Sequence, residues 1–291
     1  MEPLDVVKLK ALMERTSGRP EVMIGLIDGP VVINHPDLVG ANIREIPGML
    51  AGTCTQAESA ACLHGTFVAG ILCAKRGSIA PAICPNATLL LRPIFAETTS
   101  ADGQLPNATP EELAAVVVEC IDAGARVINL SAALAQPSTS NHRQLGEALD
   151  YAARRGVIVV AAAGNQGTLG SSAITRHPWV ISVIACDLQG RPMNQSNLGS
   201  SIGRRGLSAP GDNITSLGAE GNPLTFGGTS TAAPFVTGAV VLLWSEFPAA
   251  TAAAVKFAVT HTAAPRRTTV VPPLLDAWAA YQTMAMVNPK R

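Results

Sequence analysis

Short, nearly continuous apolar runs rich in Val, Ile and Leu alternate with helical stretches along this chain of 291 residues. Runs of this kind are typical of strands that are buried on both faces, as in a parallel sheet covered by helices. They lie at residues 22–27, 88–92, 126–130, 157–161 and 180–185. The alternation predicts an α/β chain of three layers, in which helices cover both faces of a central, mostly parallel sheet.

Two of the helical stretches carry clear end signals. In the stretch 110–123, Thr109 stands at the N-cap position, a proline opens the helix and Glu112 follows at its third position. The stretch 141–155 ends directly before Gly156, a residue that suits a left-handed C-cap. These signals predict two helices with defined ends.

The chain shows neither an internal repeat nor a low-complexity linker, so we expect residues 1–291 to form a single domain. Residues 4–16 are predicted to form one short amphipathic helix, which makes residues 1–20 a helical arm. Residues 194–222 are rich in Pro, Gly and Ser, and we interpret them as loops and short strands.

The charge balance and the apolar runs exclude several classes of protein. Lys and Arg total 21, and Asp and Glu also total 21, so the net charge argues against a strongly basic nucleic-acid binder. The apolar runs are far shorter than the ~20 residues that span a bilayer. The N-terminus lacks the apolar stretch of a secretory signal. We expect a cytoplasmic protein, or a piece of a longer one, without nucleic-acid or membrane partners.

Six cysteines are too few for a disulfide scaffold in a chain of this length. Cys54 and Cys62 lie close together in a loop-like stretch and could pair. Cys120 follows an apolar run on a predicted helix, which favours a buried, space-filling role. Cys62 lies two residues before His64, but no second ligand pair has zinc spacing, so we expect no metal and no cofactor.

Three segments concentrate residues that suit nucleophilic catalysis. Asp28 stands at the C-terminal end of the first predicted strand, where open parallel sheets form their ligand crevice. His64 precedes a run of small residues, and Ser230 follows two glycines at the start of an apolar helix. A serine hydroxyl needs a base to remove its proton, and imidazole titrates near neutrality. Asp28 would hold the other imidazole nitrogen, which completes a nucleophilic triad.

A fourth segment, residues 161–167, follows the predicted strand 157–161 and contains Asn165. Its side-chain amide could donate to a developing oxyanion beside the backbone N–H of Ser230. Taken together, the four segments point to acyl-transfer chemistry.

The four motifs resemble those of the subtilisin family of serine proteases, in that family's order. They read GLIDGPV, HGTFVAG, AAAGNQG and GGTSTAAP, and the resemblance runs from about residue 22 to 264. It implies the subtilisin-like fold and a serine endopeptidase that hydrolyses peptide or protein substrates through an acyl-enzyme. It further implies that Asp28, His64 and Ser230 are catalytic and that Asn165 is the oxyanion donor.

The resemblance also implies a set of substrate-binding residues on two walls of a specificity pocket. One wall would pair with the substrate as an added β-strand. The residues of this set are Leu130, Ser131, Ala132, Ala133, Ala162, Ala163, Gly164 and Thr229.

Some positions depart from the family's pattern. Phe67 stands where the family usually has a second histidine, and Thr231 stands where a methionine usually follows the nucleophile. Ala133 stands where the family usually has a glycine, and its methyl group would narrow the pocket or reposition its wall. The loop at 75–85 lacks the oxygen ligands of the family's calcium site, so we expect no ion there.

A narrower resemblance, through HPDLVGAN at 35–42, is to the proteases of cyanobactin biosynthesis, and it implies cleavage of the leader from a ribosomal precursor peptide. A peptide ligase or macrocyclase on the same scaffold is the first alternative. The short interval between Asp28 and His64 leaves no room for a helical insertion that would shield the acyl-enzyme from water. The second alternative, an inactive peptide-binding relative, conflicts with the intact triad.

Overall fold

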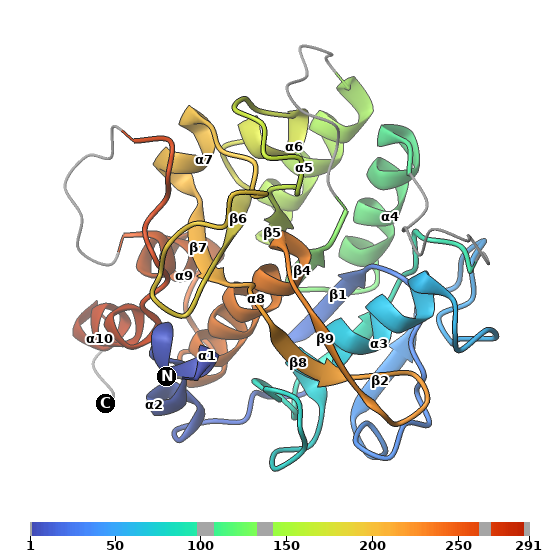
Figure 1. The fold of residues 1–291 in the computed structure, drawn as a ribbon. Helices are drawn as coiled ribbons and strands as arrows, with labels where there is room; N and C mark the ends of the chain where they lie inside the picture. Colours follow the sequence, from blue (N-terminus) through green and yellow to red (C-terminus); the bar gives the residue numbers. More distant parts are fainter. Residues whose placement is uncertain (1, 98–107, 133–141, 262–268, 288–291) are drawn as a thin grey trace.

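The structure is a computed structural model that describes residues 2–97, 108–132, 142–261 and 269–287. Its centre is a seven-stranded, parallel sheet in the order β2-β3-β1-β4-β5-β6-β7 (Figure 1). The strands are β1 (Met23–Ile27), β2 (Asn42–Glu45), β3 (Thr88–Leu91), β4 (Val127–Leu130), β5 (Ile158–Ala162), β6 (Ile181–Cys186) and β7 (Leu207–Pro210). This confirms the expected α/β fold, with a sheet that is parallel throughout.

Helices cover both faces of the sheet, and each face has its own core. Along β5, Ile158 and Val160 belong to one hydrophobic cluster, while Val159 and Ala161 belong to the other. The first cluster packs under α3 (Ala60–Cys73) and α8 (Thr229–Glu246), and the second under α4 (Pro110–Asp122) and α5 (Arg143–Arg155). Burial on both faces is why the strands read as continuous apolar runs.

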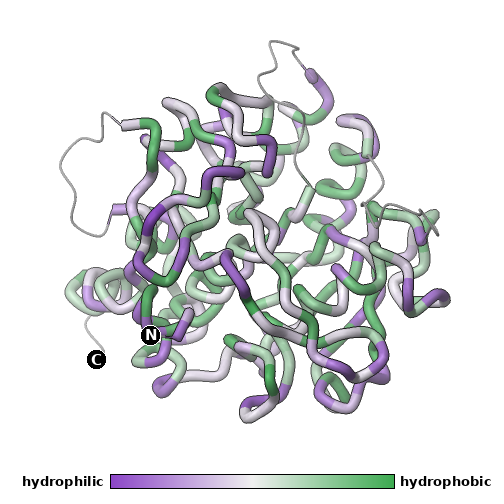
Figure 2. Tube along the Cα trace, in the orientation of Figure 1, coloured by the Kyte–Doolittle hydropathy of each residue, from purple (hydrophilic) through white to green (hydrophobic). Residues whose placement is uncertain are grey.

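The remaining elements lie around this three-layered centre. A hairpin of β8 (Ile214–Leu217) and β9 (Pro223–Phe226) is antiparallel and packs on α3. The other helices are α1 (Pro3–Val6), α2 (Leu9–Met13), α6 (Ala173–Arg176), α7 (Ser200–Arg205), α9 (Ala252–Thr260) and α10 (Ala277–Val287). Hydrophobic residues concentrate along the central elements, and hydrophilic ones along the outer turns (Figure 2).

The helix ends follow the predicted signals. Thr109 caps α4 by accepting a hydrogen bond from the N–H of Glu112, whose carboxylate accepts one from the N–H of Thr109 in return. Gly156 ends α5 at a φ of 67°, in the left-handed region that a glycine adopts without strain.

The prediction of one helix over residues 4–16 is wrong. The chain forms α1 and α2 instead, separated at Lys8, whose φ is 53°. The break lets the carbonyl of Val7 accept a hydrogen bond from the N–H of Ala277, at the start of α10. Helices α1, α2 and α10 therefore lie side by side (Figure 1), and the tertiary bond replaces a helical one.

The interpretation of residues 194–222 as loops and short strands is incomplete. This stretch contains the short strands β7 and β8, as expected, but also the helix α7. Strand β7 is an edge strand, which is where a strand tolerates a proline such as Pro210. Its Ser208 exchanges backbone hydrogen bonds with residues 273 and 275, so a distant segment completes the edge.

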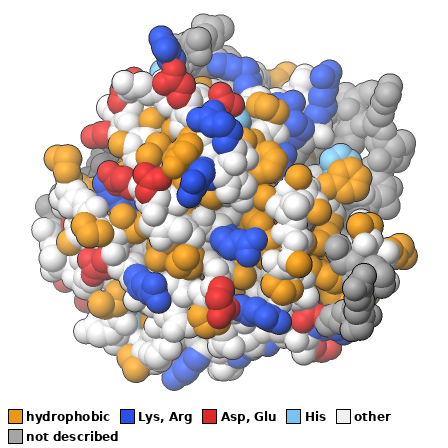
Figure 3. Space-filling model, turned by 180° about the vertical axis from the view of Figure 1, so that it is seen from behind, with side chains coloured by type: hydrophobic (Ala, Val, Ile, Leu, Met, Phe, Trp, Pro, Cys, Tyr) orange, Lys and Arg blue, Asp and Glu red, His pale blue; other side chains and the backbone are white. Residues whose placement is uncertain are grey.

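The surface reflects the balanced charge of the chain. On the face opposite to that of Figure 1, basic and acidic side chains are interspersed among apolar ones (Figure 3). Within the part of the chain that the structure describes, none of the helices combines the length and apolar character needed to cross a bilayer.

Candidate active site

The C-terminal ends of β1, β4 and β5 lie side by side because Ile27 pairs with Leu130, and Leu130 pairs with Ala161. This edge of the sheet receives Asp28, which directly follows β1 and is fully buried. One of its carboxylate oxygens, Oδ1, accepts a hydrogen bond from the N–H of Gly29 over 2.7 Å. The sheet thus places a buried carboxylate at the position where ligand crevices form.

Helix α3 approaches this carboxylate closely because glycines line the contact. A Cβ atom on Gly29 would lie 1.9 Å from the carbonyl oxygen of Ala61, and one on Gly65 would lie 2.3 Å from that of Pro30. The close approach brings the Nδ1 of His64 to 2.7 Å from the Oδ1 of Asp28.

His64 has a different partner on each ring nitrogen. Its Nε2 lies 2.9 Å from the Oγ of Ser230, on the far side of the ring from Asp28. Burial by itself would lower the pKa of His64, but the negative charge of Asp28 and the hydrogen bond to it raise that pKa above its ordinary value. With Nδ1–H donating to Asp28, the neutral ring offers Nε2 as an acceptor for the Ser230 hydroxyl.

Ser230 is the second residue of α8, and the turn before it requires glycine. Gly228 has a φ of 125°, and a Cβ atom there would lie 2.9 Å from the Nδ2 of Asn165. Ser230 itself is half-buried. Its place in the first turn of a long helix adds the positive end of the helix dipole.

Asn165 follows β5 and is oriented by Thr229. The Oδ1 of Asn165 accepts hydrogen bonds from the backbone N–H of Thr229 over 2.9 Å and from its hydroxyl over 3.0 Å. The hydroxyl of Thr229 also accepts a bond from the N–H of Gly164 over 3.1 Å. The oxygen side of the amide is therefore held against α8, which makes Nδ2 the group that can donate to a ligand.

The residues expected to bind substrate lie at the ends of β4 and β5, at the edge of the sheet that carries Asp28. Leu130 is buried, and Ser131 and Ala132 are 7% and 8% exposed at the exit of β4. Ala162, Ala163 and Gly164 form the buried exit of β5. Ala133 lies outside the described residues.

Asn129 and Thr237 form a buried polar link that sequence reasoning missed. The hydroxyl of Thr237, in α8, donates to the Oδ1 of Asn129 over 2.8 Å. The Nδ2 of Asn129 donates to the Oγ of Ser131 over 3.3 Å. An asparagine inside an otherwise apolar strand is the sequence signal that could have indicated this connection between α8 and β4.

Two aromatic rings support the imidazole. The ring of Phe226, at the end of β9, stacks on His64 with 6.3 Å between the ring centroids. The same ring lies 4.8 Å from that of Phe67, which is fully buried. Phe67, the departure from the family's second histidine, therefore packs behind the ring that contacts the imidazole.

The two cysteines whose pairing was left open form a disulfide, Cys54–Cys62, with 5.6 Å between their Cα atoms. Their sulfurs and a carboxylate oxygen of Glu97 lie within 4.8 Å of one another, a grouping that could suit a metal. While the sulfurs are bonded to each other, they are not thiolate ligands, so the expected absence of a metal stays a prediction. Cys120 is buried as predicted, and burial raises the pKa of its thiol to about 12.

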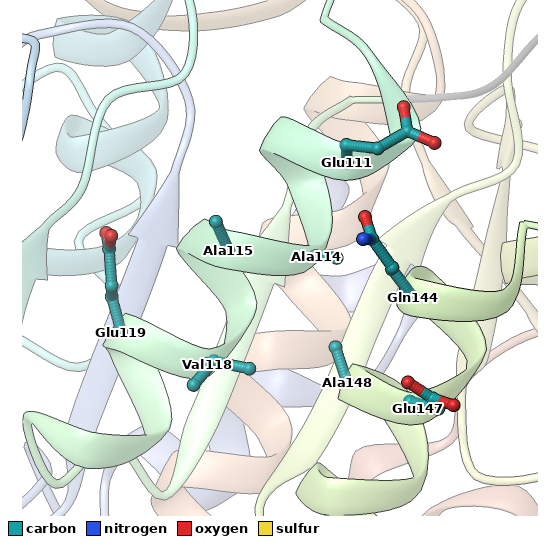
Figure 4. A pocket seen from close by; sticks show the side chains of 8 residues that line it. All are labelled: Glu111, Ala114, Ala115, Val118, Glu119, Gln144, Glu147 and Ala148. Atoms are coloured by element: carbon teal, nitrogen blue, oxygen red, sulfur yellow. The ribbon is translucent and has the colours of Figure 1, made fainter.

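A hollow lies away from these residues, between α4 and α5 (Figure 4). Its volume is about 500 Å³, and glutamates stand around a floor of alanines. Glu119 pairs with Arg92, and Glu147 pairs with Arg143 over 2.7 Å. The neighbouring arginines balance these carboxylates, and the lining offers neither a nucleophile nor an imidazole.

Comparison with known proteins gives a consistent result. The sequence model described as "Subtilase family" matches residues 19–281. Fervidolysin from Fervidobacterium pennivorans is 31% identical over 265 residues, which cover 81% of this chain and 36% of fervidolysin. Subtilisin amylosacchariticus from Bacillus subtilis subsp. amylosacchariticus is 30% identical over 263 residues, covering 88% of this chain and 64% of that protein. The chain thus spans about one to two thirds of these relatives.

Solved structures of similar proteins cover nearly the whole chain. A serine-to-alanine mutant of the protease domain of PatA superposes with a TM-score of 0.85 at 27% identity, covering 94% of this chain and 98% of that one. The prenylagaramide maturation protease PagA superposes with a TM-score of 0.82 at 27% identity and the same coverage. The PatG macrocyclase domain, at 21% identity and a TM-score of 0.82, shares the fold.

Proposed function

Because this chain belongs to the subtilase family, we propose that it is a serine endopeptidase that hydrolyses peptide bonds through an acyl-enzyme. The observation that carries the proposal is the pair of hydrogen bonds that joins Asp28, His64 and Ser230, at 2.7 Å and 2.9 Å. This arrangement is the one that converts a serine hydroxyl into a nucleophile.

In the first step, the Oγ of Ser230 attacks the substrate carbonyl while the Nε2 of His64 takes the hydroxyl proton. Asp28 stabilises the imidazolium that forms, which is the same interaction that raises the pKa of His64. His64 then gives this proton to the leaving amine, and the acyl group remains on Ser230. In the second step, His64 activates a water molecule that hydrolyses the acyl-enzyme.

The charge that develops on the carbonyl oxygen needs donors. In this proposal they are the backbone N–H of Ser230, in the first turn of α8, and the Nδ2 of Asn165. Thr229 keeps the amide of Asn165 in place through two hydrogen bonds to its oxygen. A preorganised donor is effective because it needs no rearrangement as the charge appears.

The substrate of the proposed enzyme is a peptide. Residues 130–132 would pair with it as an added strand, because they form the end and the exit of β4 at the edge of the sheet that carries Asp28. The similarity to PatA and to the maturation protease PagA supports a ribosomal precursor peptide as the natural substrate. A cytoplasmic location, and the absence of nucleic-acid and membrane partners, stay predictions from the sequence.

Hydrolysis is favoured over ring closure or ligation by the chain between Asp28 and His64. The described residues 29–59 contain strand β2 and no helix before α3 begins at Ala60. The helical insertion that would cover the acyl-enzyme is therefore missing from this interval.

The proposal is tested by digesting a diverse peptide library with the wild type and with Ser230→Ala, read by mass spectrometry. Ser200→Ala is the matched control, because Ser200 is an exposed serine at the start of another helix, α7. We expect cleavage by the wild type and the control and none by Ser230→Ala. Cleavage by Ser230→Ala contradicts the proposal, and so does a wild type that neither cleaves nor labels at Ser230 with a fluorophosphonate.

A further inference from the structure

The Cys54–Cys62 disulfide joins the two segments that carry Asp28 and His64. Cys62 lies in the first turn of α3, two residues before His64. On the other side, the N–H of Cys54 donates to the carbonyl of Val31, in the segment that follows Asp28, over 3.2 Å. One covalent bond therefore connects the exit of β1 to the helix that holds the imidazole.

The disulfide is open to solvent from one side. Cys62 is fully buried, whereas Cys54 is half-buried and lines a hollow of about 450 Å³. The walls of this hollow come from residues 32–36, from residues 54–57 and from the turn 219–221 between β8 and β9. A small thiol can enter this space, and Cys54 is the sulfur that it meets.

Glu97 places a negative charge close to both sulfurs of the disulfide. Its carboxylate accepts hydrogen bonds from the N–H groups of Thr55 and Gln56, over 3.0 Å and 2.8 Å. Burial alone would raise the pKa of Glu97, but these bonds and one from the Thr55 hydroxyl lower it, so the group is ionised at neutral pH. A negative charge within 4.8 Å of both sulfurs disfavours a thiolate and so slows thiol exchange.

We propose that the Cys54–Cys62 disulfide is a redox modification site, which thiol reductants open through Cys54 and whose reduction lowers the rate of hydrolysis. The control of the rate rests on the proposed function, whereas the reduction itself does not. The sequence predicts a cytoplasmic protein, and cytosolic disulfides, where they occur, are mostly transient or redox-sensing.

The reaction is a two-step exchange with a dithiol. A thiolate of the reductant attacks the Sγ of Cys54, forms a mixed disulfide and breaks the bond to Cys62. The electron pair of the broken bond leaves on the sulfur of Cys62, which then takes a proton. The second thiolate of the reductant then attacks the reductant sulfur of the mixed disulfide. Cys54 leaves as a thiolate and takes a proton. Two electrons and two protons pass to the protein, and the reductant ends as a cyclic disulfide.

Reduction removes the link that holds α3 against the segment after Asp28, so the hydrogen bond between Asp28 and His64 samples longer distances. Proton transfer at Ser230 depends on that alignment, and a misplacement of 1 Å can cost ~10²-fold in rate. The backbone bonds to Glu97 still hold the loop after reduction. We therefore expect kcat to fall about tenfold, which is a smaller loss than the ~10²-fold that a misplacement of 1 Å can cause, and KM to change little.

The experiment treats the oxidised protein with dithiothreitol under native conditions. Thiols are alkylated and located by mass spectrometry, and kcat and KM are measured in parallel. We expect alkylation at Cys54 and Cys62 to accompany the fall in kcat, and reoxidation to restore it. A variant with Cys54→Ser and Cys62→Ser should have the kcat of the reduced protein and no response to dithiothreitol. Cys120→Ala, which removes a buried free thiol, should keep the full response.

Glu97→Gln separates the effect of the Glu97 charge on the disulfide from the part that its hydrogen bonds have in holding the loop. It keeps an oxygen that accepts from the N–H groups of the loop, but it removes the negative charge. We expect the disulfide to be reduced several-fold faster in this variant than in the wild type. The ratio of the two rates should be larger at neutral pH, where Glu97 is ionised, than in acid. An unchanged rate of reduction would show that the charge of Glu97 does not act on the sulfurs.

The rate at which a fluorophosphonate labels Ser230 is measured in both redox states. This measurement distinguishes failure of the redox proposal from failure of the proposed protease function. Equal labelling rates, an unchanged kcat, or a disulfide that resists dithiothreitol each overturn the redox proposal and leave the protease standing. Absence of labelling and of cleavage in both states overturns the proposed function, and with it the control of its rate.

Discussion

At the scale of single residues, His64 is the group on which both proposed steps depend, because each of its nitrogens has one partner. Asp28 raises the pKa of His64 against the opposing effect of burial. Thr229 acts similarly on Asn165, since it occupies the oxygen of the amide and leaves the nitrogen for a ligand. In the proposed mechanism, two neighbours thus prepare two side chains for opposite tasks: His64 accepts a proton and Asn165 donates a hydrogen bond.

The first prediction concerns the pH dependence of kcat/KM. His64 acts as a base only when Nε2 carries no proton, so activity is lost as the pH falls through its pKa. Because this pKa is raised, we expect the half-maximal value of kcat/KM at a pH above 6.5. His142→Gln changes a histidine at the N-cap of α5 and should leave the profile unchanged. A midpoint below 6.5 in a pH series of initial rates would contradict the assignment of His64.

The second prediction concerns the proposed oxyanion donor. Asn165→Ala should lower kcat by about 10²–10³ and change KM little, a magnitude measured in a subtilisin. The donor acts on charge that exists only in the transition state, so the substrate is bound nearly as well without it. Asn213→Ala, in the bend directly before β8, is the control and should leave kcat unchanged. An unchanged kcat in Asn165→Ala would remove this residue from the reaction.

At the scale of elements, glycines decide how closely α3 approaches the strand exit that carries Asp28. A Cβ atom on Gly65 would lie 2.4 Å from the carbonyl oxygen of Gly29, which is backbone and cannot turn aside. The contrast is Gly146, near the start of α5, where nothing lies within 4 Å of the added atom. The same amino acid therefore has a steric role in one helix and none in the other.

The third prediction uses this contrast. Gly65→Ala should lower the free energy of unfolding by about 1–3 kcal/mol or more, because the clash is with backbone atoms. Gly146→Ala should raise it by up to ~1 kcal/mol, because alanine is the better helix former. Urea unfolding of both variants measures the two changes. Equal effects in the two variants would show that α3 does not depend on this close contact.

At the scale of the whole molecule, the N-terminal residues belong to the main core. Leu9 and Leu12, on α2, are fully buried in the cluster under α3 and α8. Arg76 donates hydrogen bonds to the carbonyls of Met13 and Thr16, which ties the end of α2 to the loop after α3. The described part of the expected arm, residues 2–20, therefore packs through α2 as part of one hydrophobic unit, which is the basis for proposing a single domain.

The fourth prediction tests that unit. Leu12→Ala should lower the free energy of unfolding by about 2–5 kcal/mol, as a large-to-small change in a closed core does. Val39→Ala is the control, because Val39 is 67% exposed and should change stability by less than ~0.5 kcal/mol. Calorimetry should show a single transition in both variants. A separate early transition in Leu12→Ala would mean that the arm unfolds on its own.

The sequence by itself determined the features that depend on local pattern. The five predicted strands and the two capped helices are confirmed within a residue or two over the described residues, because burial on both faces and cap chemistry leave a direct trace in the residue order. The subtilase resemblance is confirmed by the family match. The motifs also named Asp28, His64 and Ser230, which the structure brings within hydrogen-bond distance.

The tertiary structure alone decided what depends on contacts between distant segments. The edge strand β2 is short and mostly exposed, so it has no apolar run to reveal it, and it forms because β3 supplies its hydrogen bonds. The break at Lys8 exists because Val7 bonds to the start of α10. The stacking of Phe226 on His64 and the closure of the Cys54–Cys62 disulfide likewise need the folded chain, because local sequence carries no information on which residues the fold brings together.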